Sequence, residues 1–328
     1  MQQRFIAGSA TPDVVEVDET HVAAYAKAGW LLPLDGFKPD LDAMLAAATR
    51  AGTYDGKTVA LPWFVNTEGL FYRTDLVPHA PTTPQELVTA AQTALAKDPK
   101  LKYGLAFEGA KYEGVITSFM VMQGGFAGKL DPQNLNTPEN VSALTFARDL
   151  IDKYKISPKA VTGWKEGDVQ QAFTSGQAVF AVNWPFVFGT AKGTPIENKI
   201  GFVPFLGKGA TLGVETLAIN AKSKQKDAAY KLLAFLSSKQ TQITRAIATG
   251  NPPAVKAAYD TQLFQGAPFF KAVQPLADVA AVRPASPDYP KVSAELQTMF
   301  SAVLSGLAEP QAALAETAQK LQGITGGK

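Results

Sequence analysis

Hydrophobic and polar residues follow two different periods along this chain, and each period predicts a different kind of element. Short apolar runs bounded by turn residues predict buried strands, whereas apolar residues spaced three and four apart predict amphipathic helices. The predicted strands are 14–18, 58–61, 69–73, 103–107, 178–183, 199–205 and 216–221. The predicted helices are 20–28, a segment starting at Thr83-Pro84, a segment from Thr137-Pro138 to KYKISP, 227–249, and PKVSAELQTMFSAVLSGL.

Prolines and glycines mark where several of these elements begin and end. Thr83, Pro84 and Glu86 have the spacing of a capping box with proline at the first helical position. Pro62 is expected to end the strand 58–61, and Gly250 to end the helix 227–249. Because strands and helices alternate, the pattern indicates an α/β fold with parallel sheets covered by helices.

Composition narrows the possible partners. The chain has 328 residues, 46% of them hydrophobic, which is long enough for two domains. Its 31 basic and 29 acidic residues are not gathered in like-charged blocks, so neither nucleic acid nor a membrane surface is expected as a partner. No cysteine is present, which excludes disulfides and thiolate chemistry. The start of the sequence matches neither a signal peptide nor a lipidation motif, and no run of 18 apolar residues occurs.

Residues that would support catalysis or a cofactor are scarce. The two histidines, His21 and His79, lie outside any catalytic motif, and there is no GxGxxG, P-loop or HExxH sequence. The sequence therefore predicts no metal, no cofactor and no enzymatic activity.

Four residues near predicted strand ends and turns have side chains suited to a sugar, which is recognised by aromatic faces and by paired hydrogen bonds to its hydroxyls. Trp184 follows the strand 178–183, although packing in a core is its alternative role. Asp18 ends the first strand and could equally cap the next helix. Asn66 could bond a hydroxyl or close a turn, and Arg283 could clamp a ligand or lie hydrated at the surface.

An ordered set of motifs resembles the maltose/trehalose branch of the extracellular solute-binding proteins, which capture ligands for ABC sugar importers. The resemblance covers nearly the whole chain from Ser9. The motifs are GSATPDVVEVDETHVAAYAKAGWLLPLD, YDGKTVALPWFVNTEGLFYRTDLV, KYEGVITSFM, NTPENVSAL, DLIDKYKISP, FTSGQAVFAVNWPFVFG, TLGVETLAI and VRPASPDYPKVS.

This resemblance implies roles for particular residues. It implies that Asp18 and Asn66 bond sugar hydroxyls, that Gly213 offers a backbone donor, and that Arg283 is a guanidinium clamp. The implied aromatic contacts come from Phe64, Trp184 and Phe186. Tyr112, Glu113 and Glu215 complete the expected ligand-binding set, and Glu113 could instead cap a helix. Asn66 stands where aspartate is common, and Val214-Glu215 stand where glycine and tryptophan are often found, so the preferred sugar should differ.

The resemblance also implies a two-lobed periplasmic-binding-protein-like fold of type II, with three-layer αβα lobes joined by a hinge. The expected lobes are 1–66 with 214–253, and 67–213 with 254–328. Family members open with a β-α-β unit that has no counterpart here, so the first lobe is expected to be truncated at its N-terminus. The resemblance further implies that the protein is located in the periplasm or, as a lipoprotein, on the cell surface. It also implies a monomer whose partners are ABC permease subunits.

The implied function is capture of a glucose-containing disaccharide, such as trehalose, maltose or sucrose, between two hinged lobes. Two alternatives stay open on the same scaffold: a carbohydrate-active enzyme using Asp18, Glu113 or Glu215, and a sugar-sensing interaction module.

Overall fold

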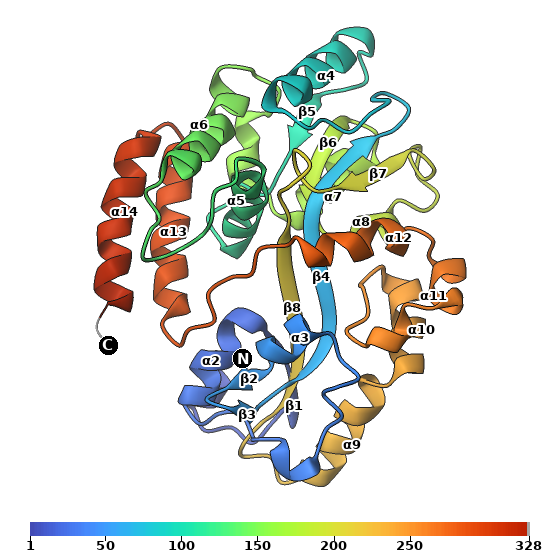
Figure 1. Cartoon of the computed structure of the whole chain (residues 1–328), viewed down its shortest axis with the longest axis vertical. Coiled ribbons are helices and arrows are strands. Elements are labelled where there is room, and N and C mark those ends of the chain that lie inside the picture. The colour runs from blue at the N-terminus through green and yellow to red at the C-terminus, as the bar shows by residue number, and fades with distance from the viewer. Residues whose placement is uncertain (327–328) are drawn as a thin grey trace. The chain divides into compact units, whose positions relative to one another are not determined.

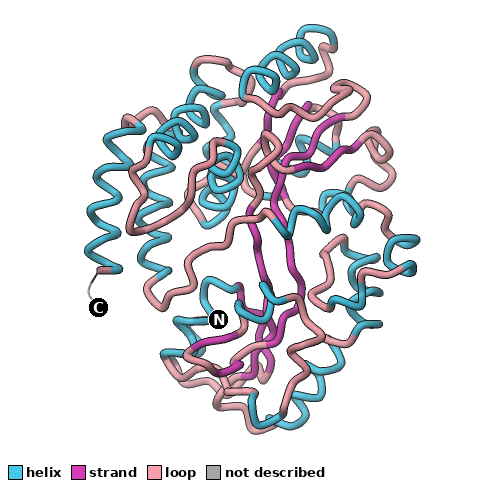
Figure 2. The backbone as a smooth tube through the Cα atoms, viewed as in Figure 1, coloured by secondary structure: helices cyan, strands magenta, loops and turns pink. Residues whose placement is uncertain are grey.

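The chain packs into two compact units, each of which is built from three separate segments. In a computed structural model that describes residues 1–326, the first unit consists of 1–66, 213–270 and 283–290, and the second of 67–212, 271–282 and 291–328. The expected lobes and these units share the boundary after Asn66, whereas 254–270 and 283–290 pack with the first unit rather than the second. Strands and helices alternate along the chain, as an α/β fold requires (Figures 1 and 2).

In the first unit, strand β1 (Val14–Asp18) pairs antiparallel with β8 (Thr211–Ile219), from Val14 opposite Ile219 to Asp18 opposite Glu215. The inward residues of β1, Val15 and Val17, pack in a hydrophobic core. The remaining elements of this unit are α1 (Gln2–Ile6), α2 (Glu19–Lys27), η1 (Asp35–Phe37), α3 (Ala46–Ala51), β2 (Thr53–Tyr54), β3 (Lys57–Thr58), α9 (Lys226–Leu236), α10 (Lys239–Thr249), η3 (Lys256–Ala258) and α11 (Thr261–Gly266).

Strand β4 (Leu61–Arg73) differs from its prediction, because Pro62 does not end a strand. The two expected strands 58–61 and 69–73 are instead one 13-residue strand with a separate short β3 before it. Proline lacks a backbone N–H, but it is tolerated near the start of a strand where that donor is not needed. The Pro62 carbonyl still accepts a 3.4 Å hydrogen bond from Gln242 Nε2.

The second unit contains a mixed sheet, which corrects the expectation of parallel sheets. The later part of β4 pairs antiparallel with both β6 (Ala178–Asn183) and β7 (Ile200–Val203), and only β5 (Tyr103–Ala106) runs parallel to β6 within the described pairs of this unit. Every residue of β6 is buried, so both faces of this strand are covered. The helices of the second unit are α4 (Pro84–Lys97), α5 (Glu113–Gly125), α6 (Pro138–Asp152), η2 (Lys159–Gly163), α7 (Glu166–Thr174), α8 (Phe186–Thr190), η4 (Gln274–Asp278) and α14 (Pro310–Thr325).

Two further helices, α12 (Phe270–Val273) and α13 (Tyr289–Leu304), begin at segment boundaries between the units. In the second unit, α14 lies beside α13 and packs on α6 (Figure 1). Within residues 1–326, no helix has the length and apolar content needed to cross a bilayer.

Helix starts and stops follow the predicted signals with two differences. The Thr83 and Thr137 side chains accept hydrogen bonds from the backbone N–H groups of Glu86 and Asn140, and Gly250 ends α10 with φ of 81°. The Glu86 carboxylate, however, accepts from the N–H of Thr82 rather than from Thr83, so only half of the capping box forms. The predicted helix 227–249 is broken into α9 and α10 at Ser238, which has an extended backbone at the N-cap position of α10 and makes no side-chain cap hydrogen bond.

Candidate functional site

A buried arginine holds two carboxylates at the end of β1. Arg283, whose side chain is 3% exposed, donates from Nη2 to Asp18 Oδ2 at 3.2 Å and to Glu19 Oε1 at 3.1 Å. Its Nε also donates to Glu19 Oε1, at 3.2 Å. Arg283 is therefore not the hydrated surface residue that the sequence left open, and its guanidinium positions two acids.

The position of Asp18 is compatible with both roles considered from the sequence, which are ligand contact and helix capping. Its Oδ1 accepts from the Thr20 backbone N–H at 2.9 Å and from the Thr20 hydroxyl, so the side chain caps α2. Burial alone would raise the pKa of this carboxyl, but the Arg283 ion pair and the Thr20 hydrogen bonds together hold its pKa below the ordinary value. Asp18 is therefore an ionised acceptor, and 30% of its side chain stays exposed.

Glu215 faces Asp18 across the β1–β8 pair, and directly opposed residues of an antiparallel pair project to the same face of a sheet. Burial and the neighbouring carboxylates of Asp18 and Glu16 raise the pKa of Glu215 to about 9, with Arg283 opposing this rise. The structure thus brings together three of the sequence-predicted residues, Asp18, Glu215 and Arg283, within the first unit.

Asn66 and Phe64, both on β4, belong to the same unit. The Asn66 amide oxygen is buried and lacks a hydrogen-bond partner within residues 1–326. Phe64 is buried, and the Arg245 guanidinium carbon lies 4.8 Å from its ring centroid and 4.5 Å from that of Trp63. Burial lowers the pKa of Arg245 to about 10, against the opposing charge of Glu16, so the guanidinium stays charged at neutral pH.

Gly213 lies in β8, directly after the chain enters the first unit. It is buried. Its expected role as a backbone donor stays a prediction.

Tyr112, in the second unit, contacts a buried group of acids that the sequence analysis did not identify. The Tyr112 hydroxyl donates to Glu108 Oε2 at 2.9 Å, and Ser118 Oγ donates to Glu68 Oε1 at 2.9 Å. Glu68 and Glu108 are both fully buried. Burial, reinforced by the charges of Glu68 and Glu166, raises the pKa of Glu108 well above its usual range.

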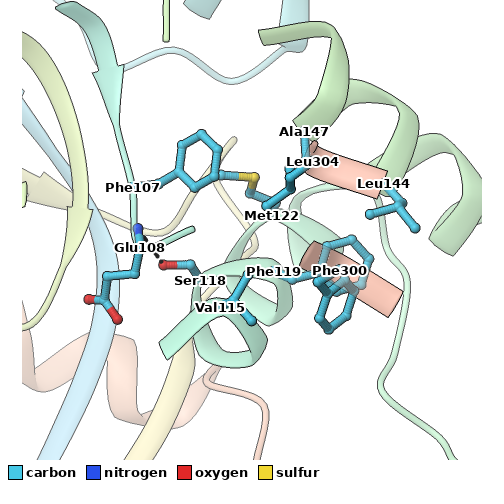
Figure 3. Close-up of a pocket in the computed structure, with 10 residues that line it drawn as sticks. All are labelled: Phe107, Glu108, Val115, Ser118, Phe119, Met122, Leu144, Ala147, Phe300 and Leu304. Carbon is cyan, nitrogen blue, oxygen red and sulfur yellow. Dashed lines mark hydrogen bonds between the residues drawn. The ribbon is translucent and has the colours of Figure 1, made fainter. Parts of the chain in front are cut away.

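The Glu108 carboxyl group is turned toward polar neighbours. Figure 3 shows it pointing away from the apolar side chains, such as Phe119 and Phe300, that surround a cavity of about 10 Å³, while the Glu108 N–H bonds Ser118 Oγ at 3.3 Å. Oε1 of Glu108 is buried without a hydrogen-bond partner within the described chain. The cavity is close to the lower limit for one water molecule, so it does not offer space for a sugar.

Glu113 is the first residue of α5, and its Oε2 accepts from Ser293 Oγ of α13 at 2.6 Å. The helix has no side-chain cap from Tyr112, which is its N-cap residue. Glu113 therefore joins two helices of the second unit, which the sequence did not anticipate.

Trp184 and Phe186 stand on either side of Pro185, where β6 leads into α8, and Phe186 is the first residue of that helix. Both side chains are half-buried, and neither ring makes a ring contact within residues 1–326. The Trp184 backbone N–H donates to Asn183 Oδ1 at 2.8 Å, which fixes the chain at the strand end. Of the two roles weighed for Trp184, an available aromatic face fits this arrangement better than a full core position.

The residues that sequence analysis missed lack a local signal. Glu19 follows Asp18 directly and reads as an ordinary first-turn acid. Glu68 stands inside the motif YDGKTVALPWFVNTEGLFYRTDLV without an implied role, and Glu108 and Arg245 lie outside the family motifs. Only their buried contacts across distant segments reveal them. Within residues 1–326, no group of three His, Asp or Glu side chains is arranged to hold a metal ion.

Comparisons with known proteins define the class to which this chain belongs. The family model for bacterial extracellular solute-binding proteins matches residues 1–272, and the chain is a member of this family. Its relatives are binding proteins and not enzymes, which confirms the expectation of binding without catalysis.

Individual relatives make the similarity more specific. A probable ABC transporter-binding protein of Deinococcus radiodurans is 32% identical over 83% of this chain and 70% of its own. The maltose-bound MalE3 structure of T. maritima is 33% identical, with a TM-score of 0.91 over 98% of this chain and 87% of that one. A ribitol complex of a solute-binding protein from Agrobacterium radiobacter K84 is 27% identical, with a TM-score of 0.84 over 98% and 87% of the two chains. These structures confirm the two-lobed, periplasmic-binding-protein-like α/β fold.

Proposed function

We propose that this protein is the sugar-capturing subunit of an ABC importer, which binds a small saccharide without changing it and presents it to membrane permease subunits. The ABC transporter relative and the maltose and ribitol complexes support this assignment. The observation that carries it is the pair of carboxylates, Asp18 and Glu19, fixed by the buried Arg283. Carboxylates held in fixed positions bond sugar hydroxyls without a large ordering cost.

The preferred ligand is a glucose-containing disaccharide such as trehalose, maltose or sucrose. Half-buried Trp184 and Phe186 offer faces for the C–H surfaces of two sugar rings, and Asn66 offers a buried amide oxygen for a hydroxyl. Both units are proposed to supply contacts, so that the sugar stabilises one conformation of the hinged protein, which the permease then reads. The protein acts as a monomer in the periplasm or as a lipoprotein at the cell surface.

The test is calorimetry and thermal shift with trehalose, maltose, sucrose, ribitol and glucose. A disaccharide bound with micromolar affinity corresponds to about −8 kcal/mol. Ligand at about 100 times its Kd should raise the free energy of unfolding by about 2.7 kcal/mol. Trp184→Ala should weaken binding at least tenfold and leave the thermal stability of the free protein nearly unchanged, whereas Phe71→Ala, in the fully buried core of the second unit, should lower stability.

Two results would contradict the assignment. One is the absence of a thermal shift and of heat with every sugar in the panel. The other is turnover of a chromogenic glycoside that Glu215→Gln or Asp18→Asn abolishes, which would identify a carbohydrate-active enzyme.

A further inference from the structure

Among residues 1–326, the carboxyl group of Glu215 differs from its neighbours in having no partner. Asp18 and Glu19 both contact Arg283, and Asp18 also accepts from Thr20. No hydrogen bond or ion pair engages the Glu215 carboxyl within the part of the chain that the structure describes. Glu215 therefore keeps its full hydrogen-bonding capacity.

The charges around Glu215 do not balance. The groups that face it are Asp18 and Glu16 on β1, Glu19 at the start of α2, and Arg283. Asp18 stands directly opposite Glu215, at the roughly 5 Å between Cβ atoms that is usual for such pairs. One guanidinium that is already engaged by two carboxylates cannot offset a third and a fourth, and like charges directly opposite each other are destabilising.

On the basis of the proposed function, we infer that Glu215 is a neutral carboxylic acid that donates its O–H to an acceptor oxygen of the bound sugar, which makes this site selective for uncharged saccharides. Asp18, by contrast, accepts from a sugar hydroxyl. Two adjacent acids with opposite hydrogen-bonding roles recognise the donor and the acceptor of a neutral polyol at once. A sugar carboxylate or phosphate would face the ionised carboxylate of Asp18, so anionic sugars are rejected.

The protonation of Glu215 is tested directly by a carbon-13 NMR titration of the glutamate carboxyl carbons in the ligand-free protein, with Glu215→Gln assigning the resonance. We expect the Glu215 carboxyl group to stay protonated at pH 7 and the chemical shift of its carbon to change near pH 9. A titration in the ordinary glutamate range, at about pH 4.3, would overturn the inference whatever the protein binds.

Calorimetry with the tightest sugar of the panel tests the contact. Affinity should be constant from about pH 6 to 8, and should fall toward tenfold per pH unit above the pKa of Glu215. Glu215→Gln, a permanently neutral donor, should bind less than about fivefold more weakly and lose this pH dependence, whereas Glu215→Leu should bind more than about thirtyfold more weakly. Glucuronate should bind at least about a hundredfold more weakly than glucose.

The controls separate this inference from the proposed function. Glu139→Gln, an exposed change on α6, should keep the wild-type pH profile, and circular dichroism should exclude alkaline unfolding. A wild-type profile that is flat to about pH 10, or Glu215→Gln binding as weakly as Glu215→Leu, would overturn the neutral-donor role while sugar binding stands. A protein that binds no sugar at any pH would overturn both.

Discussion

The burial and the charge state of single residues in this protein depend on partners that lie far away along the chain. Arg283 meets Asp18 and Glu19 across more than 260 positions, and it is buried because those two carboxylates neutralise it. The charges that raise the pKa of Glu108 come, within the described chain, from two further acids, Glu68 and Glu166. The carboxyl group of Asp18 is therefore ionised and that of Glu108 is protonated, and each environment gives a separate prediction.

Arg283→Lys should weaken sugar binding at least tenfold although it keeps the charge. A lysine ammonium cannot make the three guanidinium hydrogen bonds to Asp18 and Glu19 at once, so both carboxylates lose their fixed positions. Titration calorimetry measures the affinity, and the free energy of unfolding should fall by about 1–3 kcal/mol. Lys222→Arg, a change at a residue outside this group, is the matched control and should alter neither quantity. Unchanged affinity in Arg283→Lys would show that the ion pairs do not position the site.

Glu108→Gln should stabilise the protein at neutral pH and much less in acid. The pKa of Glu108 is raised in the folded state, so the unfolded chain loses this proton first as the pH rises above about 4.5, and the stability of the wild type then falls. Below that pH both states are protonated and the difference disappears. The free energy of unfolding at pH 7 should rise by about 1–3 kcal/mol, measured by chemical denaturation.

For this second test the control is again Glu139→Gln, since that side chain is exposed. Equal stabilisation by Glu108→Gln at pH 7 and pH 4 would contradict the assignment of a buried, protonated acid.

At the scale of elements, local signals decided where helices begin, and neighbouring elements decided where strands end. Thr83 and Thr137 form the expected caps because a threonine oxygen and a nearby N–H need no distant partner. Pro62 was expected to end a strand, yet β4 runs through it for 13 residues. Proline removes only its own backbone N–H donor, and near the start of a strand the other residues can still form the hydrogen bonds of the sheet.

Thr83→Ala should destabilise the protein by about 1 kcal/mol, because the N–H of Glu86 at the start of α4 loses its acceptor. The matched control is Thr89→Ala on the exposed side of the same helix, which should change stability by no more than about 0.5 kcal/mol. Thermal unfolding followed by circular dichroism measures both variants, and equal effects of the two would show that the cap contributes nothing.

At the scale of the whole molecule, the chain enters and leaves each compact unit more than once. The first unit needs 1–66, 213–270 and 283–290 together, and the only strand paired with β1 among the described strands is β8. The hydrophobic clusters of the first unit therefore combine residues of 1–66 with residues of 213–270.

An isolated fragment of residues 1–66 should consequently remain unfolded. Without 215–219, β1 has neither its hydrogen-bonding partner nor the core residue Ala218. Circular dichroism should show little secondary structure and no cooperative melt, while the full chain melts cooperatively. A cooperative transition in the fragment would mean that 1–66 forms a domain by itself.

The sequence by itself determined the α/β alternation, the helix starts, the absence of catalytic motifs and the family resemblance, because periodicity, caps and ordered motifs depend on residues close together in the chain. The tertiary structure alone decided that the sheet of the second unit is mixed and that Arg283 is buried between Asp18 and Glu19. It also decided that Glu215 stands opposite Asp18 with no side-chain partner among residues 1–326. Strand direction, burial and charge pairing arise between segments that lie far apart in the chain, and no local pattern encodes which segments meet.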